Sequence, residues 1–361
     1  MHIRTKSLPL SAKLLQKNFN LELPTPYNDI VLPNAWEIEN KSFININSSG
    51  LKVSYTDPDE NKAIIIRANH PIPLECVIFY FEIKIKNKGK NGMIGVGYCT
   101  KKNDKELGGS NIKTDYIYNM LMPGQENGLW GCGYHGDDGY SFCSGSGEPY
   151  GPTYTVGDII GCYLNFIKKI IFYTKNGVNL GIACHLPDDF KNIIYPCVGF
   201  KSQGGSVEVN FGRETFKYSA MTYEDISKIS NSNILTRLKD IFRKKSNNIL
   251  ILKDQEKVHL IMGKNENVLV NLTGELTKSL EKKQISQGQI FFLMGEYYNA
   301  LETLTKLLEI EPDNIMALRY RGEIYYVMKK YKESIADLKK LLEIKPDDEW
   351  ATKAQELVET M

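Results

Sequence analysis

A glycine-rich motif is the first feature of this sequence that could do chemistry. Residues 131–136 read Gly-Cys-Gly-Tyr-His-Gly, which is the spacing of a dinucleotide-binding turn. Such a turn must open a helix whose N-terminus faces the pyrophosphate. Asp137, Asp138 and Gly139 follow instead; they are typical of a hairpin turn, and the two carboxylates would repel a phosphate. The sequence therefore argues against a nucleotide site, and we predict no cofactor.

Metal-binding patterns are incomplete in this chain. Residues 57–61 read Asp-Pro-Asp-Glu-Asn and begin like a calcium loop, but the sixth position is Lys62 instead of Gly and the twelfth is Ala68 instead of Glu. No Cys-x-x-Cys and no pair of histidines at ligand spacing occurs. We therefore interpret residues 57–61 as a surface turn and predict no metal site.

A thiol nucleophile is the remaining catalytic possibility. Cys143 and His135 lie on either side of an expected turn, but no third group orients the histidine and nothing supplies an oxyanion hole. The 7 cysteines are widely spaced in apolar sequence, which predicts reduced core residues. We therefore predict no catalytic residues and no enzyme activity, with a Cys-dependent hydrolase as the alternative.

Composition narrows the class of protein. The 361 residues are 42% hydrophobic and 24% charged, as in soluble globular proteins, and are too many for one undivided core. Lys and Arg number 45 against 43 Asp and Glu, so a net charge of +2 provides no field for holding a phosphate backbone. No stretch of 18 apolar residues occurs, and the apolar run near the start is too short and interrupted for a secretory leader, so we expect none. We predict no nucleic-acid, membrane or small-molecule partner, and a cytoplasmic location with the nucleus as the alternative.

The first two thirds of the chain show strand periodicity. Tyr80, Glu82, Lys84 and Lys86 alternate with apolar residues, which predicts a strand with one wetter face. Asn176–Gly177 predicts a tight hairpin turn, because both residues tolerate positive φ. Many short strands separated by turns indicate an antiparallel sandwich or barrel. Further strands are expected at residues 64–67, 92–98, 158–165, 169–174, 195–200 and 206–211.

The last 80 or so residues contain an internal repeat. Residues 308–314 (Leu-Glu-Ile-Glu-Pro-Asp-Asn) recur 34 residues later as residues 342–348 (Leu-Glu-Ile-Lys-Pro-Asp-Asp). Gly288 and Gly322 keep the same displacement, as do Leu304 and Leu338. A helix-turn-helix unit of this length, with small residues where helices cross, resembles the tetratricopeptide repeat. Two copies are expected at residues 281–348, closed by a final helix.

The β-rich block contains an ordered series of motifs: residues 32–36 (Leu-Pro-Asn-Ala-Trp), 67–73 (Arg-Ala-Asn-His-Pro-Ile-Pro), 79–84 (Phe-Tyr-Phe-Glu-Ile-Lys), 150–158 (Tyr-Gly-Pro-Thr-Tyr-Thr-Val-Gly-Asp) and 195–199 (Tyr-Pro-Cys-Val-Gly). On these motifs the block resembles a SPRY domain, most closely that of the Ran-binding-protein-M scaffold proteins. This resemblance covers about half of the chain and implies a bent, concanavalin A-like sandwich of two sheets that binds proteins. The LisH and CTLH helices that continue those scaffold proteins are not found after residue 217.

These observations predict a multidomain β + α chain in four parts. An N-terminal extension takes residues 1–31, the SPRY β-sandwich residues 32–216, a helical connector or degenerate repeat residues 217–280, and an all-α array of two repeats plus a closing helix residues 281–361. The connector contains a basic run at residues 237–245, to which we assign no function.

The SPRY resemblance implies a partner surface on the loops at one end of the sandwich. In this sequence those loops are residues 56–62, 103–125 and 201–205. Aromatic and thioether side chains in the middle loop are of kinds enriched at interfaces, with lining of the fold as the alternative for at least two of them. The candidate partner-binding residues are Asp57, Asp59, Tyr116, Tyr118, Met120, Met122, Lys201 and Gln203.

The repeat resemblance implies a concave groove, lined by the first helix of each unit, that takes a peptide or a partner helix. The alternative is that its aromatic residues are ordinary core between helices. The groove residues are Lys282, Ile285, Gln289, Phe292, Met316, Arg319, Glu323 and Tyr326. Together the two parts predict a non-enzymatic adaptor that holds proteins or peptides, with a substrate-receptor or scaffold subunit of a ubiquitin ligase as the alternative.

Overall fold

The computed structural model describes residues 31–37, 43–59, 62–73, 76, 78–100, 122–125, 130–188, 190, 192–221 and 284–360. Strands occupy the described residues up to 210, and helices occupy those from 284 onwards. The predicted N-terminal extension and helical connector, including the basic run at 237–245, lie almost wholly outside the described residues.

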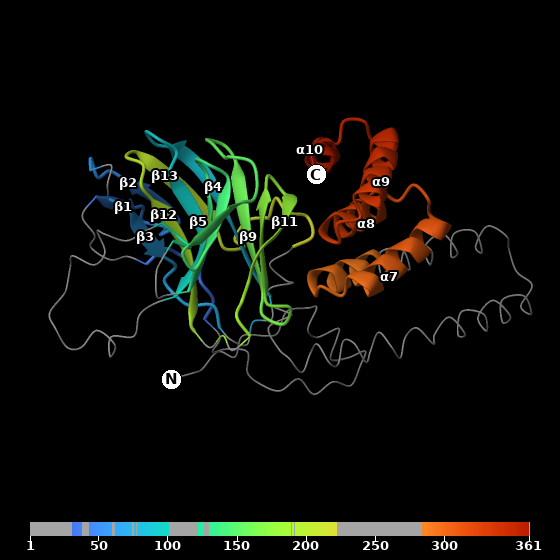
Figure 1. The fold of residues 1–361 in the computed structure, drawn as a ribbon, viewed down its shortest axis with the longest axis horizontal. Helices are drawn as coiled ribbons and strands as arrows, with labels where there is room; N and C mark the ends of the chain where they lie inside the picture. The colour runs from blue at the N-terminus through green and yellow to red at the C-terminus, as the bar shows by residue number, and fades with distance from the viewer. Residues whose placement is uncertain are drawn as a thin grey trace, which may run out of the picture. The chain divides into compact units, whose positions relative to one another are not determined.

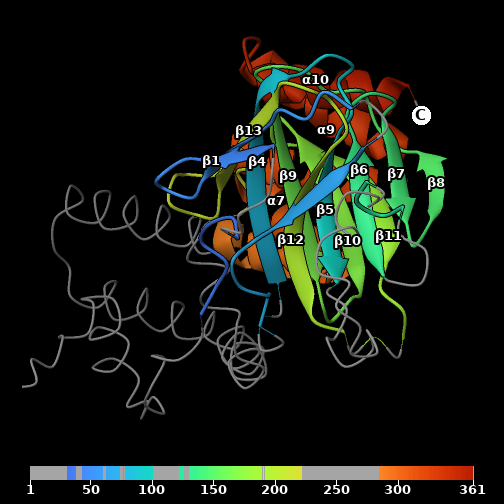
Figure 2. The ribbon, with the colours of Figure 1, turned by 90° about the vertical axis from the view of Figure 1, so that its left-hand side faces the viewer.

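The β-rich part is an antiparallel sandwich of two sheets (Figures 1 and 2). The seven-stranded sheet has the order β1 (Ile44–Ile46), β2 (Lys52–Tyr55), β13 (Gly205–Asn210), β4 (Ile78–Lys88), β9 (Ile159–Asn165), β10 (Ile170–Lys175) and β11 (Val178–His185). The six-stranded sheet has the order β3 (Ile64–Arg67), β12 (Ile194–Phe200), β5 (Ile94–Thr100), β6 (Gly131–His135), β7 (Tyr140–Cys143) and β8 (Ser146–Pro149). The predicted fold is confirmed, and each of the six further strands expected above has bounds within two residues of those observed.

Aromatic side chains fill the space between the two sheets. Tyr98 of β5 is fully buried and its hydroxyl donates to the Cys162 carbonyl oxygen of β9, 2.8 Å away in the other sheet. Its ring meets Phe81 of β4 edge-on, with centroids 5.6 Å apart. Such pairs add to the large apolar area that each ring buries, so they fix how the sheets face each other.

The hairpin predicted at Asn176–Gly177 is confirmed. β10 and β11 pair antiparallel, with Lys175 opposite Val178, so the turn consists of two residues. Asn176 has φ +53° and Gly177 has φ +82°, which is the left-handed backbone that a tight turn between right-twisted strands requires.

The prediction that one face of β4 is exposed to water is wrong for the first half of the strand. Lys84 and Lys86 are exposed, but Tyr80 is fully buried and Glu82 is only 4% exposed. The segment that follows β13 lies over this part of the sheet, because the Lys217 and Tyr218 amides donate to the Glu82 carboxylate at 2.9 and 3.0 Å. A long-range contact therefore overrides the local alternation pattern.

The helical part consists of stacked helical hairpins, as the repeat predicted (Figure 1). Helical residues 284–293 precede α7 (Tyr297–Ile310), α8 (Ile315–Val327), α9 (Tyr331–Ile344) and α10 (Glu349–Glu359). Asn314 caps α8 by accepting from the Ala317 amide, and Asp348, at the equivalent repeat position, caps α10 by accepting from the Ala351 amide, each at 3.0 Å. None of the helices in the described ranges has the length and apolar composition that crossing a bilayer requires.

Candidate interaction surfaces

Three connections of the sandwich converge at one end, which we call the loop end (residues 56–59, 88–92 and 201–205). The Gly204 amide donates to Tyr55 O at 2.8 Å, so the β12–β13 loop meets the β2–β3 loop. The Lys90 amide donates to Gln203 O at 3.0 Å, which brings in the β4–β5 turn. The Ser202 hydroxyl, itself buried, donates to Lys88 O at 2.9 Å. Two of the three predicted partner loops therefore lie together.

The predicted residues of the loop end differ in how much they present to solvent. Gln203 is exposed, and Lys201 and Asp59 are partly exposed. Asp57 is 2% exposed, and its Oδ1 accepts from the Asp59 amide at 2.9 Å, which shapes the turn. Its Oδ2 is buried with no hydrogen bond among the described residues. The structure therefore places Asp57 beneath the surface, so it is not presented to a partner in this conformation.

The middle predicted loop is described only at residues 122–125. Tyr116, Tyr118 and Met120 lie outside the described residues. Met122 is 4% exposed, so it lines the fold, which was the alternative for these side chains. Pro123 follows it and fits against the sheet because Gly199 has no side chain there: a Cβ on Gly199 would lie 2.2 Å from Pro123 Cδ. His135 Nε2 lies 2.9 Å from Pro123 O and helps to hold this segment.

The predicted repeat groove is lined by buried and partly exposed residues. Phe292, Glu323 and Tyr326 are at most 7% exposed. Gln289, Arg319, Ile285 and Met316 are partly exposed, and Lys282 lies outside the described residues. Ile285 and Met316 border an open hollow beside the α7–α8 connection, apart from the other groove residues.

Sandwich residues occupy the groove. Tyr326 Oη donates to Leu180 O of β11 at 3.3 Å, and Gln289 Nε2 donates to Ala220 O at 2.8 Å. Tyr163 Oη of β9 donates to Leu293 O. Phe292, Glu323 and Tyr326 are therefore not available to a peptide in this conformation.

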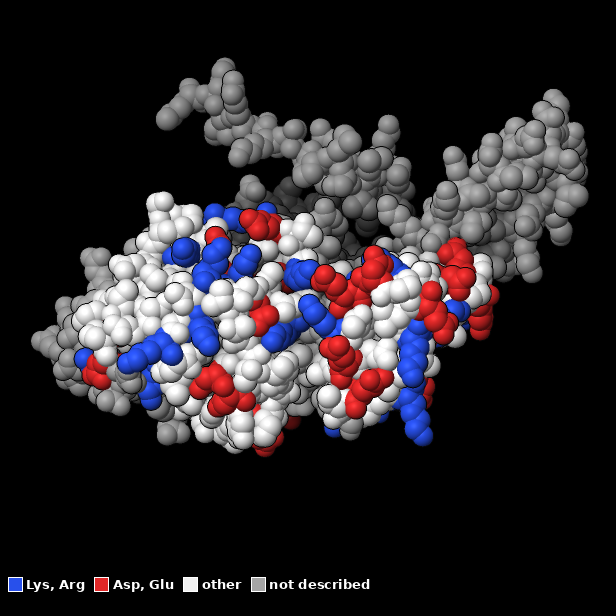
Figure 3. Space-filling view, turned by 90° about the horizontal axis from the view of Figure 1, so that it is seen from above, with Lys and Arg blue, Asp and Glu red and all other residues white. Residues whose placement is uncertain are grey.

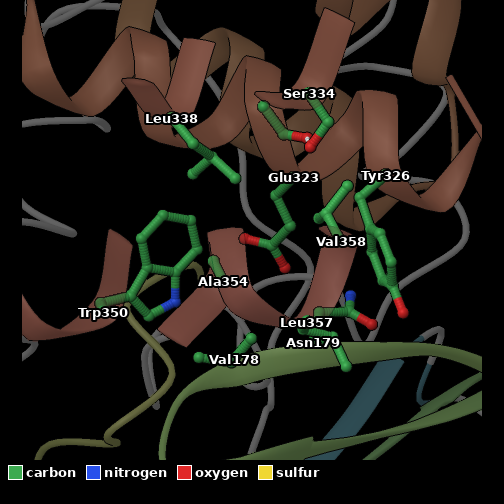
Figure 4. A pocket seen from close by; sticks show the side chains of 11 residues that line it. Val178, Asn179, Glu323, Tyr326, Ser334, Leu338, Trp350, Ala354, Leu357 and Val358 are labelled. Atoms are coloured by element: carbon green, nitrogen blue, oxygen red, sulfur yellow. Dashed lines mark hydrogen bonds between the residues drawn. The ribbon is translucent and has the colours of Figure 1, made fainter. Parts of the chain in front are cut away.

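Trp350 of α10 completes the contact between repeats and sandwich. Its Nε1 donates to Gly177 O in the β10–β11 turn at 2.8 Å, and the guanidinium of Arg319 lies 4.0 Å from the centroid of its ring. The space left among β11, α8, α9 and α10 is about 10 Å³, close to the least that one water molecule needs. This contact is a filled interface, and Figure 4 shows its side chains converging from the strand and the helices.

Glu323 is a buried titratable residue at this interface. Its Oε1 accepts from Tyr218 Oη at 2.6 Å. Burial raises the pKa of Glu323 from 4.5 to about 7, against the lowering effects of the Tyr218 hydrogen bond and the positive charge of Arg319. Burial also lowers the pKa of Arg319. The carboxyl therefore titrates near neutral pH in the docked arrangement.

Sequence reasoning missed Tyr218 and Trp350 as interface residues, and it missed Glu82 as the buried acceptor that holds the segment around Tyr218 on the sheet. Glu82 also accepts from Tyr80 Oη at 2.9 Å, and burial raises its pKa. A carboxylate among apolar strand residues was the available signal, but the alternation pattern placed it on a wet face. Trp350 had no such signal, since a tryptophan in a closing helix is consistent with packing inside the repeat array.

The cysteines depart from the predicted pattern at two positions. Cys76, Cys99, Cys132, Cys162 and Cys197 are buried, as predicted, but Cys143 and Cys184 form a disulfide. Because Cys143 is bonded, it is not a free nucleophile here. His135 is 3% exposed, stacks on Phe142 with ring centroids 4.4 Å apart, and burial lowers its pKa. The hydrolase alternative therefore has no support in the described residues.

Charges of both signs are interspersed on the face seen in Figure 3, where Lys and Arg lie among Asp and Glu. Exposed ion pairs among the described residues include Lys86 with Glu208 at 2.9 Å and Lys306 with Glu302 at 2.7 Å. Exposed pairs of this kind contribute little to stability. The expectation that no nucleic acid binds stays a prediction.

Family comparisons agree with the motifs read from the sequence. Residues 78–214 match the SPRY domain family, and residues 285–314 and 315–348 match tetratricopeptide repeat families. The chain therefore contains a SPRY domain followed by tetratricopeptide repeats, which confirms the predicted resemblance. Both are protein-interaction modules.

Curated relatives share about half of this chain. It is 41% identical over 196 residues to Ran-binding protein 10 of Danio rerio, which covers 53% of this chain and 29% of the relative. It is also 41% identical over 196 residues to Ran-binding protein 9 of Homo sapiens, and the match covers 53% of this chain and 24% of the relative. The Ran-binding protein M homolog of Arabidopsis thaliana is 34% identical over 206 residues, covering 56% and 38%. The chain is homologous to these proteins but spans well under two thirds of their length.

Solved structures similar to this chain include a human SPRY domain, with 24% identity and a TM-score of 0.37, covering 48% of this chain and 97% of that one. The SPRY domain of human HERC1 is 17% identical with a TM-score of 0.35, covering 47% and 94%.

Proposed function

We propose that this chain, a SPRY domain followed by tetratricopeptide repeats and homologous to Ran-binding proteins 9 and 10, is an adaptor that binds partner proteins through the loop end of its sandwich. The observation that carries the proposal is the convergence of the β2–β3 and β12–β13 loops, joined by the Gly204 amide at 2.8 Å from Tyr55 O. Loops held by a rigid scaffold are a common place for binding residues.

The side chains at the loop end suit a polar partner surface. Gln203 offers amide donors and an acceptor, Lys201 offers an ammonium group, and Asp59 offers a carboxylate that also pairs with Lys62 at 3.5 Å. The backbone beneath them is tied by hydrogen bonds, so ordering these loops on binding costs little conformational entropy. The repeats contribute their first-helix side chains to the sandwich interface, which leaves the loop end as the favoured surface.

The proposal is tested in the full-length chain with a loop variant and a matched control. The loop variant combines Asp59→Ala, Lys201→Ala and Gln203→Ala. The control combines Glu302→Ala and Lys306→Ala on α7, whose side chains are 65% and 62% exposed and form an ion pair away from the loop end. Proteins cross-linked to each form in cell extract are captured and quantified.

We expect the partners captured by the wild type to fall about tenfold with the loop variant and to persist with the control. Equal recovery of every partner with the loop variant would refute the loop end as the binding surface. Circular dichroism of all three forms establishes that they are folded alike.

A narrower proposal is that the adaptor serves as a substrate-receptor or scaffold subunit of a ubiquitin ligase. The homology to Ran-binding proteins 9 and 10 supports it, because the resemblance to the Ran-binding-protein-M type implies this role. Gentle lysis followed by capture of the full-length chain tests it. Recovery of ubiquitin-transfer subunits in stoichiometric amounts is the expected result, and their absence while other partners are retained would count against it.

A further inference from the structure

A histidine and two aspartates meet at the turn between β6 and β7. A ring nitrogen of His135 and one carboxylate oxygen from each of Asp137 and Asp138 all lie within 4.8 Å of one another. Imidazole nitrogens and carboxylate oxygens are donor atoms that divalent transition metals accept together. The group therefore has the chemistry of a metal site, although it lies outside the patterns of paired histidines and paired cysteines considered in the sequence.

Packing determines which nitrogen of His135 is available to an ion. Nε2 lies 2.9 Å from Pro123 O, and a carbonyl oxygen only accepts, so in the neutral ring Nε2 carries the hydrogen and Nδ1 keeps its lone pair. The ring is 3% exposed and stacks on Phe142, which holds its orientation. Histidines that bind metals typically donate their second nitrogen to a carbonyl or carboxylate oxygen in this way, because the bond sets the tautomer.

Backbone hydrogen bonds hold the turn that carries the two carboxylates. The Gly139 amide donates to His135 O at 3.2 Å, which closes the turn, and the Gly136 amide donates to Ile94 O at 2.9 Å, which anchors the turn to β5. Gly139 has φ +76°, a left-handed conformation that glycine adopts without strain. The sandwich itself therefore places the three donor side chains.

The two carboxylates lack a cationic partner in the sandwich. None of the ion pairs within the described residues includes Asp137 or Asp138. Asp138 Oδ1 accepts from the Tyr140 amide at 2.9 Å, which leaves Oδ2 for another bond. Two negative charges on adjacent residues repel each other, and a bound cation between them replaces that repulsion by attraction.

The spacing of the donors suits a small ion. Donor atoms about 2.1 Å from a tetrahedral zinc ion lie about 3.4 Å from one another. The three donors are at most 4.8 Å apart, so an adjustment of no more than about 1.4 Å brings them to this distance. Asp138 is exposed, and rotation of its side chain provides an adjustment of this size.

We propose that His135, Asp137 and Asp138 form a binding site for a divalent transition metal ion such as Zn²⁺, and that the ion holds the β6–β7 turn to the end of β6. Three protein donors leave the fourth position of a tetrahedral ion to water or to a donor atom of another molecule. Asp137 lies beside Gly92 of the loop end, since a Cβ on Gly92 would be 4.0 Å from the Asp137 Cβ. The proposal does not depend on partner binding at the loop end.

Calorimetric titration of the full-length, untagged chain with zinc chloride tests the site. Bound metal is first removed with a chelator, which is then removed by gel filtration. The site variant combines Asp137→Asn and Asp138→Asn, which removes two charges but keeps a side-chain oxygen that accepts from the Tyr140 amide. The control combines Glu302→Gln and Glu309→Gln, two exposed carboxylates of α7, and changes the net charge by the same amount.

We expect one zinc ion to bind the wild type and the control with equal affinity, and to bind the site variant at least about tenfold more weakly. Equal affinities of the site variant and the wild type would overturn the proposal. Calcium chloride at the same concentrations should not displace the zinc, because calcium prefers a shell of oxygen donors alone. Displacement by calcium would overturn the assignment to a transition metal.

X-ray absorption by the zinc-loaded wild type identifies the donors without any variant. Nitrogen and oxygen donors lie about 2.0 to 2.2 Å from zinc, whereas cysteine sulfurs lie about 2.3 Å from it. We expect a first shell of nitrogen and oxygen alone. A sulfur shell would place the ion at cysteines and would overturn the proposal, and this measurement decides the matter if the site variant fails to fold.

Amide hydrogen exchange tests whether the ion holds the turn. Exchange at residues 136–140 should slow by about tenfold when zinc is added to the wild type and should stay unchanged in the site variant, because an ion bound only to the closed turn opposes its opening. An unchanged rate in the zinc-loaded wild type would show that the ion does not hold the turn.

Discussion

The loop end of the sandwich and the groove of the repeats are both surfaces of a kind that binds proteins, but the folded chain treats them in opposite ways. At the loop end, hydrogen bonds between backbone groups hold the loops while Gln203 remains exposed. In the groove, Tyr326 and Glu323 are buried against β11 and Tyr218. A surface of a known type is therefore open to partners only where the rest of the chain leaves it uncovered.

The chemical difference between the two surfaces explains this outcome. The covered part of the groove includes the aromatic side chains of Phe292 and Tyr326, whose exposure would leave apolar area in water. The loop end is lined by polar side chains that water solvates well. Covering the first and leaving the second open lowers the free energy of the folded chain, and the following measurements test that comparison.

The largest effect is expected from Trp350→Ala. The indole is 9% exposed and donates to Gly177 O, and its removal leaves Arg319 without the ring that it covers. We expect a loss of about 3 to 5 kcal/mol in the free energy of unfolding, as for other buried tryptophans. Urea titration measures it.

Tyr298→Ala is the control for that variant, because Tyr298 is 76% exposed on α7 and should change stability by less than about 0.5 kcal/mol. A similar small change for Trp350→Ala would mean that the groove is not held closed by this contact.

The next largest effect should be the change with pH in the free energy of unfolding that the titration of Glu323 causes. The folded pKa of Glu323 is about 7, above its ordinary 4.5, so its contribution to stability is fully present below pH 4.5 and is lost as pH rises through 7. The shift corresponds to roughly 3 kcal/mol. Glu323→Gln should remove this part of the pH dependence, measured as the difference between wild type and variant in urea titrations from pH 4 to 8.

A wild-type curve parallel to that of Glu323→Gln across this pH window would mean that the carboxyl does not titrate inside a closed interface. The loop variant serves as the comparison, because its substituted residues lie away from Glu323 and should leave the slope unchanged.

Substitutions of two glycines separate the cost of backbone strain in a turn from the cost of a clash with the segment that follows β13. Gly177 and Gly157 both have positive φ, at +82° and +92°. A Cβ on Gly177 would lie 2.6 Å from Lys217 O, whereas one on Gly157 meets nothing within 4 Å. Gly157→Ala should cost about 1 kcal/mol from backbone strain alone, and Gly177→Ala about 1 to 2 kcal/mol more.

Thermal unfolding of both glycine variants measures the difference. Equal losses of stability in the two variants would mean that the segment around Lys217 does not pack against the β10–β11 turn. The inference that this segment covers that face of the sheet would then be wrong.

The smallest effect on stability is expected at the loop end. Lys201→Ala together with Gln203→Ala removes solvated side chains and should change the free energy of unfolding by less than about 0.5 kcal/mol. The same double variant should lose partner binding. A large loss of stability would show that these side chains support the fold and would weaken the contrast between the two surfaces.

Local patterns were sufficient for much of the fold. The period-two alternation placed the strands, Asn176–Gly177 placed a hairpin, and the 34-residue recurrence placed the helices, because each pattern records a preference of the backbone within a few residues. The loops at residues 56–62 and 201–205 could also be named in advance, because the SPRY resemblance implies which loops lie at that end of the sandwich.

The sequence therefore predicts best the structure of residues whose environment is set by near neighbours along the chain. Other features depend on positions far apart in the sequence. Trp350 docks on Gly177, 173 residues away, and Cys143 is bonded to Cys184, 41 residues away. The burial of Tyr80 and Glu82 likewise depends on the segment that follows β13. Such contacts depend on how whole sheets and helices pack, since the free energy of covering apolar area is gained only after the elements have formed. Sequence alone thus identified both binding scaffolds, and only the tertiary structure decided which of them remains open.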